Sequence, residues 1–283
     1  MRKISEVFIN GVCLKEILED HEKWLNGEND GERANLNGAD LSDANLKNAN
    51  LSNADLRNAN LNNADLHGTN LRDTDLSDAD LSDANLSFAD LNDPNSRCAY
   101  LRFADLSDAD LSDADLSHAY LGYTNLRGAN LSCANLSCAN LSCAYLRFAD
   151  LSYTNLSGAD LSHAYLRDAD LMDADLMDID LSYADLSYAN LISVDLRNAD
   201  LRNTDLSYTD LSCADLRNAN LSCADLRNAD LSHTDLSHTD LNDTDLSYAD
   251  LRFADLSYTD LSYTDLTGTD LSSANLGDTN LEE

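Results

Sequence analysis

The chain has 283 residues and a formal net charge of −34, from 52 acidic and 18 basic side chains. A surface this acidic repels nucleic acid, so direct nucleic-acid binding is not expected. No apolar run approaches the length of a membrane span, and no N-terminal stretch has the apolar core of a signal peptide, which favours a cytoplasmic protein without membrane contact. The seven cysteines do not indicate a secreted disulfide framework, because such frameworks occur in small, loop-rich chains.

Residues 1–33 do not follow the pattern of the rest of the chain. Val7-Phe8-Ile9, followed by Asn10-Gly11, predicts a short strand that enters a tight turn. An amphipathic helix is predicted next, and Gly27 is placed to end it in a left-handed conformation. The apolar stripe of this helix comprises Leu14, Ile17, Leu18, Trp24 and Leu25. We expect residues 1–33 to cap the array that follows, since the end of a repeat stack needs covering. The alternative is a helix that binds a partner.

From residue 34 onward, a unit of five residues repeats as far as Leu281. Each unit reads Ala-(Asp/Asn)-Leu-x-x, with Thr often in place of Ala, and only Ser96 breaks the Leu series. In a helix, residues five apart lie about 140° apart round the axis, so the Leu side chains would cover every face. A continuous strand does not fit either, because its side chains alternate with period two. Short extended pieces with Ala and Leu inward, joined by turns at x-x, would build a coil that stacks on itself.

The repeated unit resembles the A(D/N)LXX repeat of the pentapeptide-repeat proteins, over residues 34–281. This resemblance implies an all-β solenoid in the form of a right-handed quadrilateral β-helix, in which four units make one coil. About fifty units would then make about twelve coils. The expected organisation is a strand and helical cap over residues 1–33, followed by a β-helix over residues 34–283.

One unit departs from the repeat. In the stretch Asn92-Asp93-Pro94-Asn95-Ser96, Pro94 stands where Ala is expected and Ser96 where Leu is expected. Proline cannot donate to a backbone ladder, and a buried serine leaves a cavity or a hydroxyl without a partner. We expect a kink or a small bulge over residues 92–97, and the alternative is a regular but strained coil.

With twenty residues in a coil, residues twenty apart stack in columns on the outside. Two runs of the position before Leu hold only aspartate: Asp205, Asp225, Asp245 and Asp265 in one column, and Asp210, Asp230, Asp250 and Asp270 in the other. Because neighbouring carboxylates repel each other, we expect each to raise the pKa of the next.

Tyrosine replaces Asp or Asn in only four units, and these tyrosines also pair twenty residues apart. Further aromatic residues and arginines stand in the same or neighbouring units. Together they form a candidate protein-binding patch, since Tyr and Arg favour the centres of interfaces: Tyr100, Phe103, Tyr120, Tyr123, Tyr145, Arg147, Phe148, Tyr165 and Arg167. The alternative is that the rings stack only to stabilise neighbouring coils.

The pattern does not indicate catalysis, a cofactor or a metal site. Cys133, Cys138 and Cys143 stand five apart, so they would occupy three different faces and could not converge on zinc. Every outward Asp belongs to the repeat, and no phosphate-binding loop or nucleophile motif occurs. We therefore expect no enzyme activity.

Two functions fit the pattern. The first is a non-enzymatic scaffold or protein-interaction module with a strongly acidic surface, whose partner the sequence does not identify. The second, suggested by the gyrase-protecting, quinolone-resistance members of the resembling family, is a DNA mimic that occupies a type II topoisomerase. A homodimer through an uncapped C-terminal coil is a further expectation, because an open solenoid end exposes apolar surface.

Overall fold

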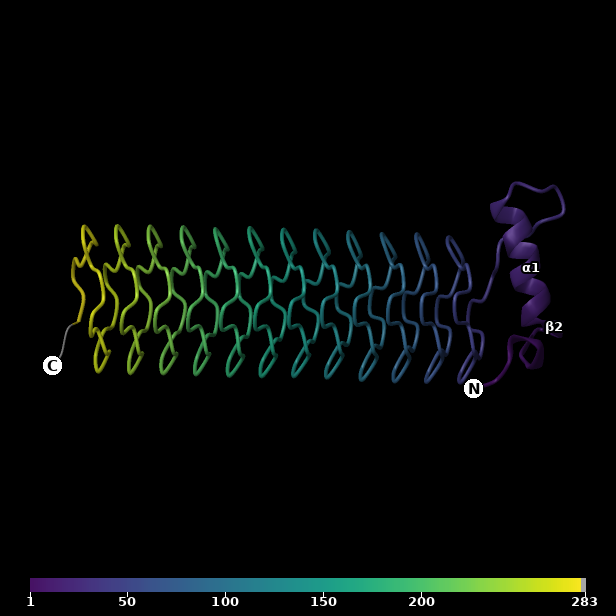
Figure 1. Cartoon of the computed structure of the whole chain (residues 1–283), viewed down its shortest axis with the longest axis horizontal. Coiled ribbons are helices and arrows are strands. Elements are labelled where there is room, and N and C mark those ends of the chain that lie inside the picture. The colour runs from purple at the N-terminus through teal and green to yellow at the C-terminus, as the bar shows by residue number, and fades with distance from the viewer. Residues whose placement is uncertain (281–283) are drawn as a thin grey trace. The chain divides into compact units, whose positions relative to one another are not determined.

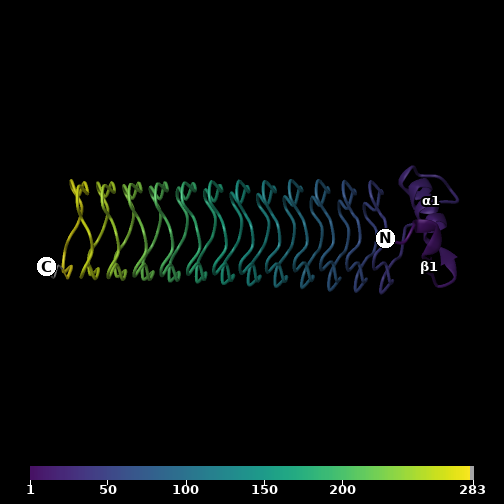
Figure 2. The same ribbon diagram turned by 60° about the horizontal axis from the view of Figure 1, so that its bottom comes forward.

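The computed structural model describes residues 1–280. Leu281, the last leucine of the predicted series, and the predicted uncapped end of the chain lie outside the described residues. The chain forms two compact units, Met1–Ala139 and Asn140–Glu283, and each is treated by itself. In each unit the backbone runs through successive coils of similar size, coloured purple to teal in the first and green to yellow in the second (Figures 1 and 2).

The N-terminal segment of the first unit begins with a short 3-10 helix, Ile4–Glu6, and a hairpin. Strand β1 (Phe8–Ile9) pairs antiparallel with β2 (Val12–Cys13), with Ile9 opposite Val12. The two turn residues between them, Asn10 and Gly11, have φ values of 51° and 88°. Positive φ at both positions is the requirement of the type I′ turn, which Asn-Gly satisfies best, so the hairpin follows directly from that dipeptide.

Helix α1 (Leu14–Leu25) follows the hairpin and lies beside the first coil (Figure 1). It ends at Asn26, and Gly27 follows with φ of 75°, the left-handed conformation that glycine adopts without steric cost. The predicted apolar stripe is only partly buried, and Trp24 keeps 38% of its surface exposed. The fully buried residues of α1 are Leu14 and, contrary to expectation, the polar His21.

The repeat array is held together by parallel bridges between residues twenty apart. Asn35 pairs with Asp55 in the first unit, and Asp150 pairs with Asp170 in the second. Four five-residue units therefore occupy one coil, and the Leu and Ala positions turn inward, where nearly all of them are buried. No stretch of the array forms a strand longer than a single bridge within residues 1–280, because a turn interrupts the chain in every unit.

Each turn places the last residue of the unit in the left-handed region. Asn203 has φ of 57° and Tyr208 has φ of 60°, and the N–H of the following Ala or Thr donates to the carbonyl of the Leu three residues before it. Positive φ at the third residue of a four-residue turn is the mark of type II geometry. The residues at this position are Gly, Asn, Asp, Ser, Cys, His, Phe and Tyr, and none of those with positive φ is β-branched. The position written as variable in the repeat is therefore restricted by its backbone.

A β-branched residue at this position should weaken the fold. We expect Asn203→Val to lower the free energy of unfolding by about 1–3 kcal/mol, because the branched Cβ is strained at positive φ. Ser212→Val is the matched control, since Ile192 already occupies the equivalent place in its own unit. Chemical denaturation of both variants checks the prediction, and equal midpoints would contradict it.

Threonine in the Ala position is accommodated by a hydrogen bond inside the coil. Thr204 is buried, and its Oγ1 donates to the carbonyl of Leu181, 2.9 Å away and 23 residues earlier. Thr124 makes the same bond to Leu101 at 2.8 Å. No buried side-chain oxygen or nitrogen in residues 1–280 lacks a partner, so the inward hydroxyls are compatible with the apolar interior.

The predicted kink or bulge over residues 92–97 is wrong. Asn95 is bridged to Asp75 in the coil before and to Asp115 in the coil after, so the register of twenty residues continues unchanged. Pro94 cannot make the N–H bond that closes the other turns, but its carbonyl still accepts from Asp115 N–H at 3.0 Å. The N–H groups that donate between coils belong to other positions in the unit. For this reason Pro94 removes one turn bond and leaves the stacking intact.

Candidate protein-binding surface

The acidic position of the repeat first serves the backbone. In unit after unit, the Asp or Asn side chain accepts a hydrogen bond from the N–H two residues later, as Asp160 does from Ser162 at 3.0 Å. The Ser162 hydroxyl also donates to the same oxygen at 2.7 Å. This Asx turn satisfies an N–H that the coil would otherwise leave without a partner, which explains why Asp or Asn precedes Leu in nearly every unit.

Arginine side chains link the aspartates of successive coils. Arg197 lies 2.5 Å from Asp195 of its own unit and 3.7 Å from Asp215 of the next coil. Arg217 continues the series, 2.5 Å from Asp215 and 3.6 Å from Asp235. The charges therefore alternate along this column, and the repulsion between stacked carboxylates is offset where an arginine stands between them.

The net pKa shift of several members of the two aspartate columns is downward, although Asp250 does raise the pKa of Asp270 as expected from stacking. Burial raises the pKa of Asp225, but hydrogen bonds from Arg227 outweigh burial and leave that pKa below its ordinary value. A hydrogen bond from Arg252 lowers the pKa of Asp250. Hydrogen bonds from Thr267 and Ser272 lower the pKa values of Asp265 and Asp270. Hydrogen bonds to the ionised form outweigh the repulsion because they are made within the same unit.

The lowered pKa values set how stability should change in acid. A carboxyl whose pKa is lower in the folded chain than in the unfolded chain stabilises the fold above about pH 4, and this contribution is lost as the pH falls through the lowered value. We expect the melting temperature to fall steadily below about pH 4. Circular dichroism melts between neutral pH and strong acid measure this, and a melting temperature that rises in acid would contradict it.

Outward rings stack wherever two of them stand twenty residues apart. The stacks have centroid separations of 4.9–5.3 Å, and they include pairs outside the predicted patch. Those additional pairs are His163–Tyr183, Tyr188–Tyr208, His233–Phe253 and His238–Tyr258. The ladder fixes the separation of stacked side chains, so stacking alone is a consequence of register and does not mark a site.

In the first unit, four predicted patch residues form two stacks on one side of the coil. Tyr100 and Tyr120 lie parallel with centroids 5.0 Å apart, and Phe103 lies 5.3 Å from Tyr123. Arg102, which the sequence analysis did not single out, places its guanidinium 5.3 Å from the Phe103 ring. We call these five residues the first aromatic cluster.

In the compact unit Asn140–Glu283, the remaining residues of the predicted binding patch belong to a larger group. Tyr145 and Tyr165 stack at 5.1 Å and are 47% and 49% exposed. Two residues after these tyrosines stand Arg147 and Arg167. The Arg147 guanidinium lies 4.5 Å above the Phe148 ring, and that of Arg167 lies 5.0 Å from the ring of Tyr188. We call this group the second aromatic cluster, and its members are Tyr145, Arg147, Phe148, Tyr165, Arg167, Asp168, Tyr188 and Tyr208.

Asp168 connects the two arginines of the second cluster. Its carboxylate lies 3.3 Å from Arg147 and 3.7 Å from Arg167. Neither Asp168 nor the Tyr188–Tyr208 stack, which has a centroid separation of 4.9 Å, was predicted from the sequence. The spacing of twenty residues between Tyr188 and Tyr208 was the available signal.

The cysteines and other possible metal ligands do not gather into a site in the part of the chain that the structure describes. Cys133, Cys138 and Cys143 are free thiols, and no three His, Cys, Asp or Glu side chains of residues 1–280 are grouped so as to hold a metal ion. Over the same residues, α1 is too short and polar to cross a membrane, and no other helix could do so.

The repeat is recognised by comparison with known families. The family described as pentapeptide repeats matches the chain in eight copies, over residues 32–63, 59–93, 97–132, 109–142, 139–178, 179–212, 209–247 and 249–283. The chain belongs to the pentapeptide-repeat family. This membership confirms the predicted repeat solenoid, and no protein of curated function matches the chain.

Several solved structures of pentapeptide-repeat proteins match this chain. HetL of the cyanobacterium Nostoc, a protein involved in the regulation of heterocyst differentiation, is 32% identical over 90% of this chain and 92% of its own, with a TM-score of 0.31. A trypsin-treated form of QnrB1, a plasmid-mediated fluoroquinolone resistance protein, is 18% identical over 70% and 91%, with a TM-score of 0.29. A protein from the thylakoid lumen of Arabidopsis thaliana is 28% identical over 44% and 70%, with a TM-score of 0.26.

Proposed function

We propose that this pentapeptide-repeat protein is a non-enzymatic protein-interaction module that contacts its partner through the second aromatic cluster. The carrying observation is that half-exposed rings and two arginines gather on one face of an otherwise acidic array. Tyrosine and arginine are the residues that contribute most at the centres of protein interfaces.

The charge balance of the cluster supports this proposal. Elsewhere in the second unit an arginine stands between two aspartates, as Arg217 does between Asp215 and Asp235. In the second aromatic cluster, two arginines stand beside one carboxylate, since Arg147 and Arg167 both pair with Asp168. The cluster is thus a local excess of positive charge beside apolar rings, which favours a partner with acidic and apolar groups.

The competing interpretation is that the rings only stabilise neighbouring coils. The His238–Tyr258 stack has a centroid separation of 4.9 Å and, within residues 1–280, no arginine over its rings, so it fits that interpretation. It therefore supplies a control for the cluster, because replacing Tyr258 removes a stack without touching an arginine.

A comparative pull-down tests the proposal. We expect a partner identified by mass spectrometry to be captured by the natural protein and by Tyr258→Asp, and to be lost from the double variant Tyr145→Asp, Tyr165→Asp. Melting temperatures of the two variants are compared to exclude unfolding as the cause. A partner set that is the same for all three proteins would reject the second aromatic cluster as the interface.

The net charge of −34 supports an alternative function as a DNA mimic for a type II topoisomerase. The arginines between stacked aspartates weaken this alternative, since they reduce the negative charge presented by each column. A supercoiling assay with gyrase separates the two functions, and absence of inhibition at micromolar protein removes the alternative.

We also propose that residues 1–33 cap the array of residues 34–283 and that the array winds as a right-handed four-sided β-helix of about twelve coils. The bridges between residues twenty apart within each unit support four sides. The hydrogen bonds of His21 to Ala34 and Ser52 support the cap.

A further inference from the structure

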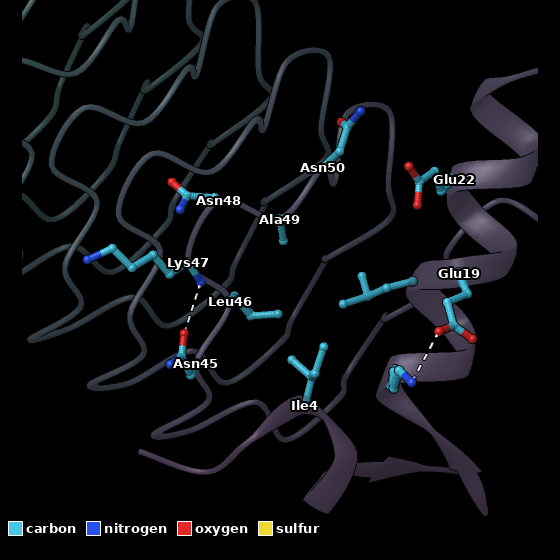
Figure 3. A pocket seen from close by; sticks show the side chains of 11 residues that line it. Ile4, Glu19, Glu22, Asn45, Leu46, Lys47, Asn48, Ala49 and Asn50 are labelled. Carbon is cyan, nitrogen blue, oxygen red and sulfur yellow. Dashed lines mark hydrogen bonds and ion pairs between the residues drawn. The ribbon is translucent and has the colours of Figure 1, made fainter.

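A cleft of about 350 Å³ lies between helix α1 and the first coil, residues 34–53. Ile4 and Leu18 contribute apolar surface from the N-terminal segment, and the half-buried Ala49 contributes it from the coil, beside the buried Leu46. Figure 3 shows Leu46 and Ala49 turned toward the segment that carries Ile4 and α1. Ala49 is half-buried here, unlike nearly all the alanines at its position farther along the array.

The wall of this cleft is the open backbone edge of the array. Between coils, Leu46 N–H donates to the carbonyl of Asp65, Asn48 N–H to that of His67, and Asn70 N–H to that of Ala49. Each unit thus donates two hydrogen bonds to the following coil and accepts one from it. On its other edge, the unit accepts two hydrogen bonds from the preceding coil and donates one to it. The first coil has no coil before it within residues 1–33, so its edge depends on the N-terminal segment.

The N-terminal segment covers this edge on both sides of the cleft. Arg2 pairs with Ala44 as a parallel bridge, donating to the carbonyl of Asp43 at 2.6 Å and accepting from Asn45 N–H at 2.8 Å. On the other side, His21 Nε2 contacts the carbonyl of Ser52 at 3.1 Å. Arg2 therefore shows that a short extended segment can add to this coil as a strand.

Between these two contacts, several backbone groups of residues 45–50 stay open. Within residues 1–280, no group donates to the carbonyls of Asn45 and Lys47, and none accepts from Asn50 N–H. Each of these is a group that a preceding coil would engage, and all three residues line the cleft. Figure 3 shows this stretch facing α1 across the cleft.

We propose that an extended, acidic peptide segment of a partner protein binds in this cleft as a parallel strand added to the first coil. Its N–H groups donate to the carbonyls of Asn45 and Lys47, and one of its carbonyls accepts from Asn50 N–H. An apolar side chain of the peptide packs against Ile4, Leu18 and Ala49. Main-chain bonds supply affinity in such strand addition, and the side-chain contacts supply specificity.

Lys15 and Lys47 line the cleft together with Glu19 and Glu22, so the charges of the cleft itself balance, and the preference for an acidic peptide comes from the hollow beside it. The chain has only four lysines, and three of them, Lys3, Lys15 and Lys47, line a hollow that adjoins the cleft. Lys15 pairs with Glu19 at 3.4 Å, whereas Lys3 and Lys47 form no ion pair within residues 1–280. In a chain of net charge −34, this lysine group favours an acidic segment that most of the surface would repel.

The test uses a peptide written in the repeat pattern and the full-length protein. The probe is fluorescein-labelled, acetylated Asp-Leu-Ser-Asp-Ala-Asn, and its matched control carries N-methyl groups on Leu and on the second Asp, which removes the two donors. We expect saturable fluorescence anisotropy with the first peptide and about tenfold weaker binding with the second, for the loss of two backbone hydrogen bonds. Lys47→Glu should weaken binding of the first peptide about fivefold.

The control variant is Lys23→Glu, which alters the one lysine that pairs with Asp20, away from the cleft, and should leave binding unchanged. Absence of saturable binding, equal affinity of the N-methylated peptide, or equal effects of the two lysine variants would each overturn the proposal. Light scattering that shows a dimer dissociated by Lys47→Glu would assign the cleft to a second copy of this chain instead. Neither aromatic cluster takes part, so this test and the pull-down can fail independently.

Discussion

Replacing Ser96 with leucine should raise the free energy of unfolding by about 1–3 kcal/mol, the value of burying one leucine side chain. Ser96 is 2% exposed and stands in the column of Leu76 and Leu116, one coil before and one coil after. The register is unbroken on both sides, so the new side chain enters a regular stack. The natural serine therefore weakens an otherwise continuous apolar ladder.

The reverse change in the same column supplies the comparison. Leu116→Ala should lower the free energy of unfolding by about 2–5 kcal/mol, because it removes buried methyl groups and leaves a cavity between stacked coils. Ser272→Leu, at an exposed outward position, should change stability by no more than about 0.5 kcal/mol. Urea denaturation measures all three, and a Ser96→Leu protein no more stable than the natural one would show that the coil cannot accept leucine there.

Acidification through the histidine range should release helix α1 from the first coil. His21 is fully buried, its Nδ1 accepts from Ala34 N–H at 3.1 Å, and its Nε2 lies 3.1 Å from the carbonyl of Ser52. Because Nδ1 accepts, the proton of the neutral ring must sit on Nε2 and be donated to Ser52. A second proton on Nδ1 would break the bond to Ala34.

The sign of this effect follows from the shifted pKa. Burial lowers the pKa of His21, the carbonyl of Ser52 partly offsets this, and Arg33 lowers it further. The contribution of His21 to stability is therefore complete above about pH 6.5 and is lost as the pH falls from there through the lowered folded value. Carboxylate protonation acts only below about pH 4, so the N-terminal segment should loosen before the array does.

Trp24 reports this step, since it is the only tryptophan and stacks on His21 at 5.7 Å. We expect its fluorescence to titrate with a midpoint below about pH 6.5 in the natural protein and to lose that step in His21→Gln. His21→Ala should cost about 1–3 kcal/mol for each backbone group left buried without a partner. An unchanged titration in His21→Gln would refute the assignment.

Much of the architecture could be predicted from the sequence because the repeat is short and strict. A period of five excludes a helix and a strand, and the inward Ala and Leu positions are buried as expected. The spacing of twenty residues also correctly predicted that Tyr100 stacks on Tyr120 and Tyr145 on Tyr165. These results depend only on spacing, which a sequence states directly.

The sign of the aspartate pKa shifts could not be predicted from column spacing. Spacing places carboxylates one coil apart, but it does not show that Asp250 accepts hydrogen bonds from Arg252 of its own unit. Pro94 was misjudged for a related reason, because the sequence shows a missing N–H and the structure shows which bond that N–H would have made. In both cases the deciding quantity is the direction of a particular hydrogen bond.

By itself, therefore, the sequence determined the repeat, its inward residues and the pairing of its outward rings. Only the tertiary structure decided that His21 is buried between Ala34 and Ser52, that Asp168 joins two arginines, and that residues 45–50 of the first coil keep an open edge. The physical reason is that the five-residue period determines which residues stack on one another. How the ends of the array are covered, and which way the long side chains point, depends on contacts with segments that follow no period.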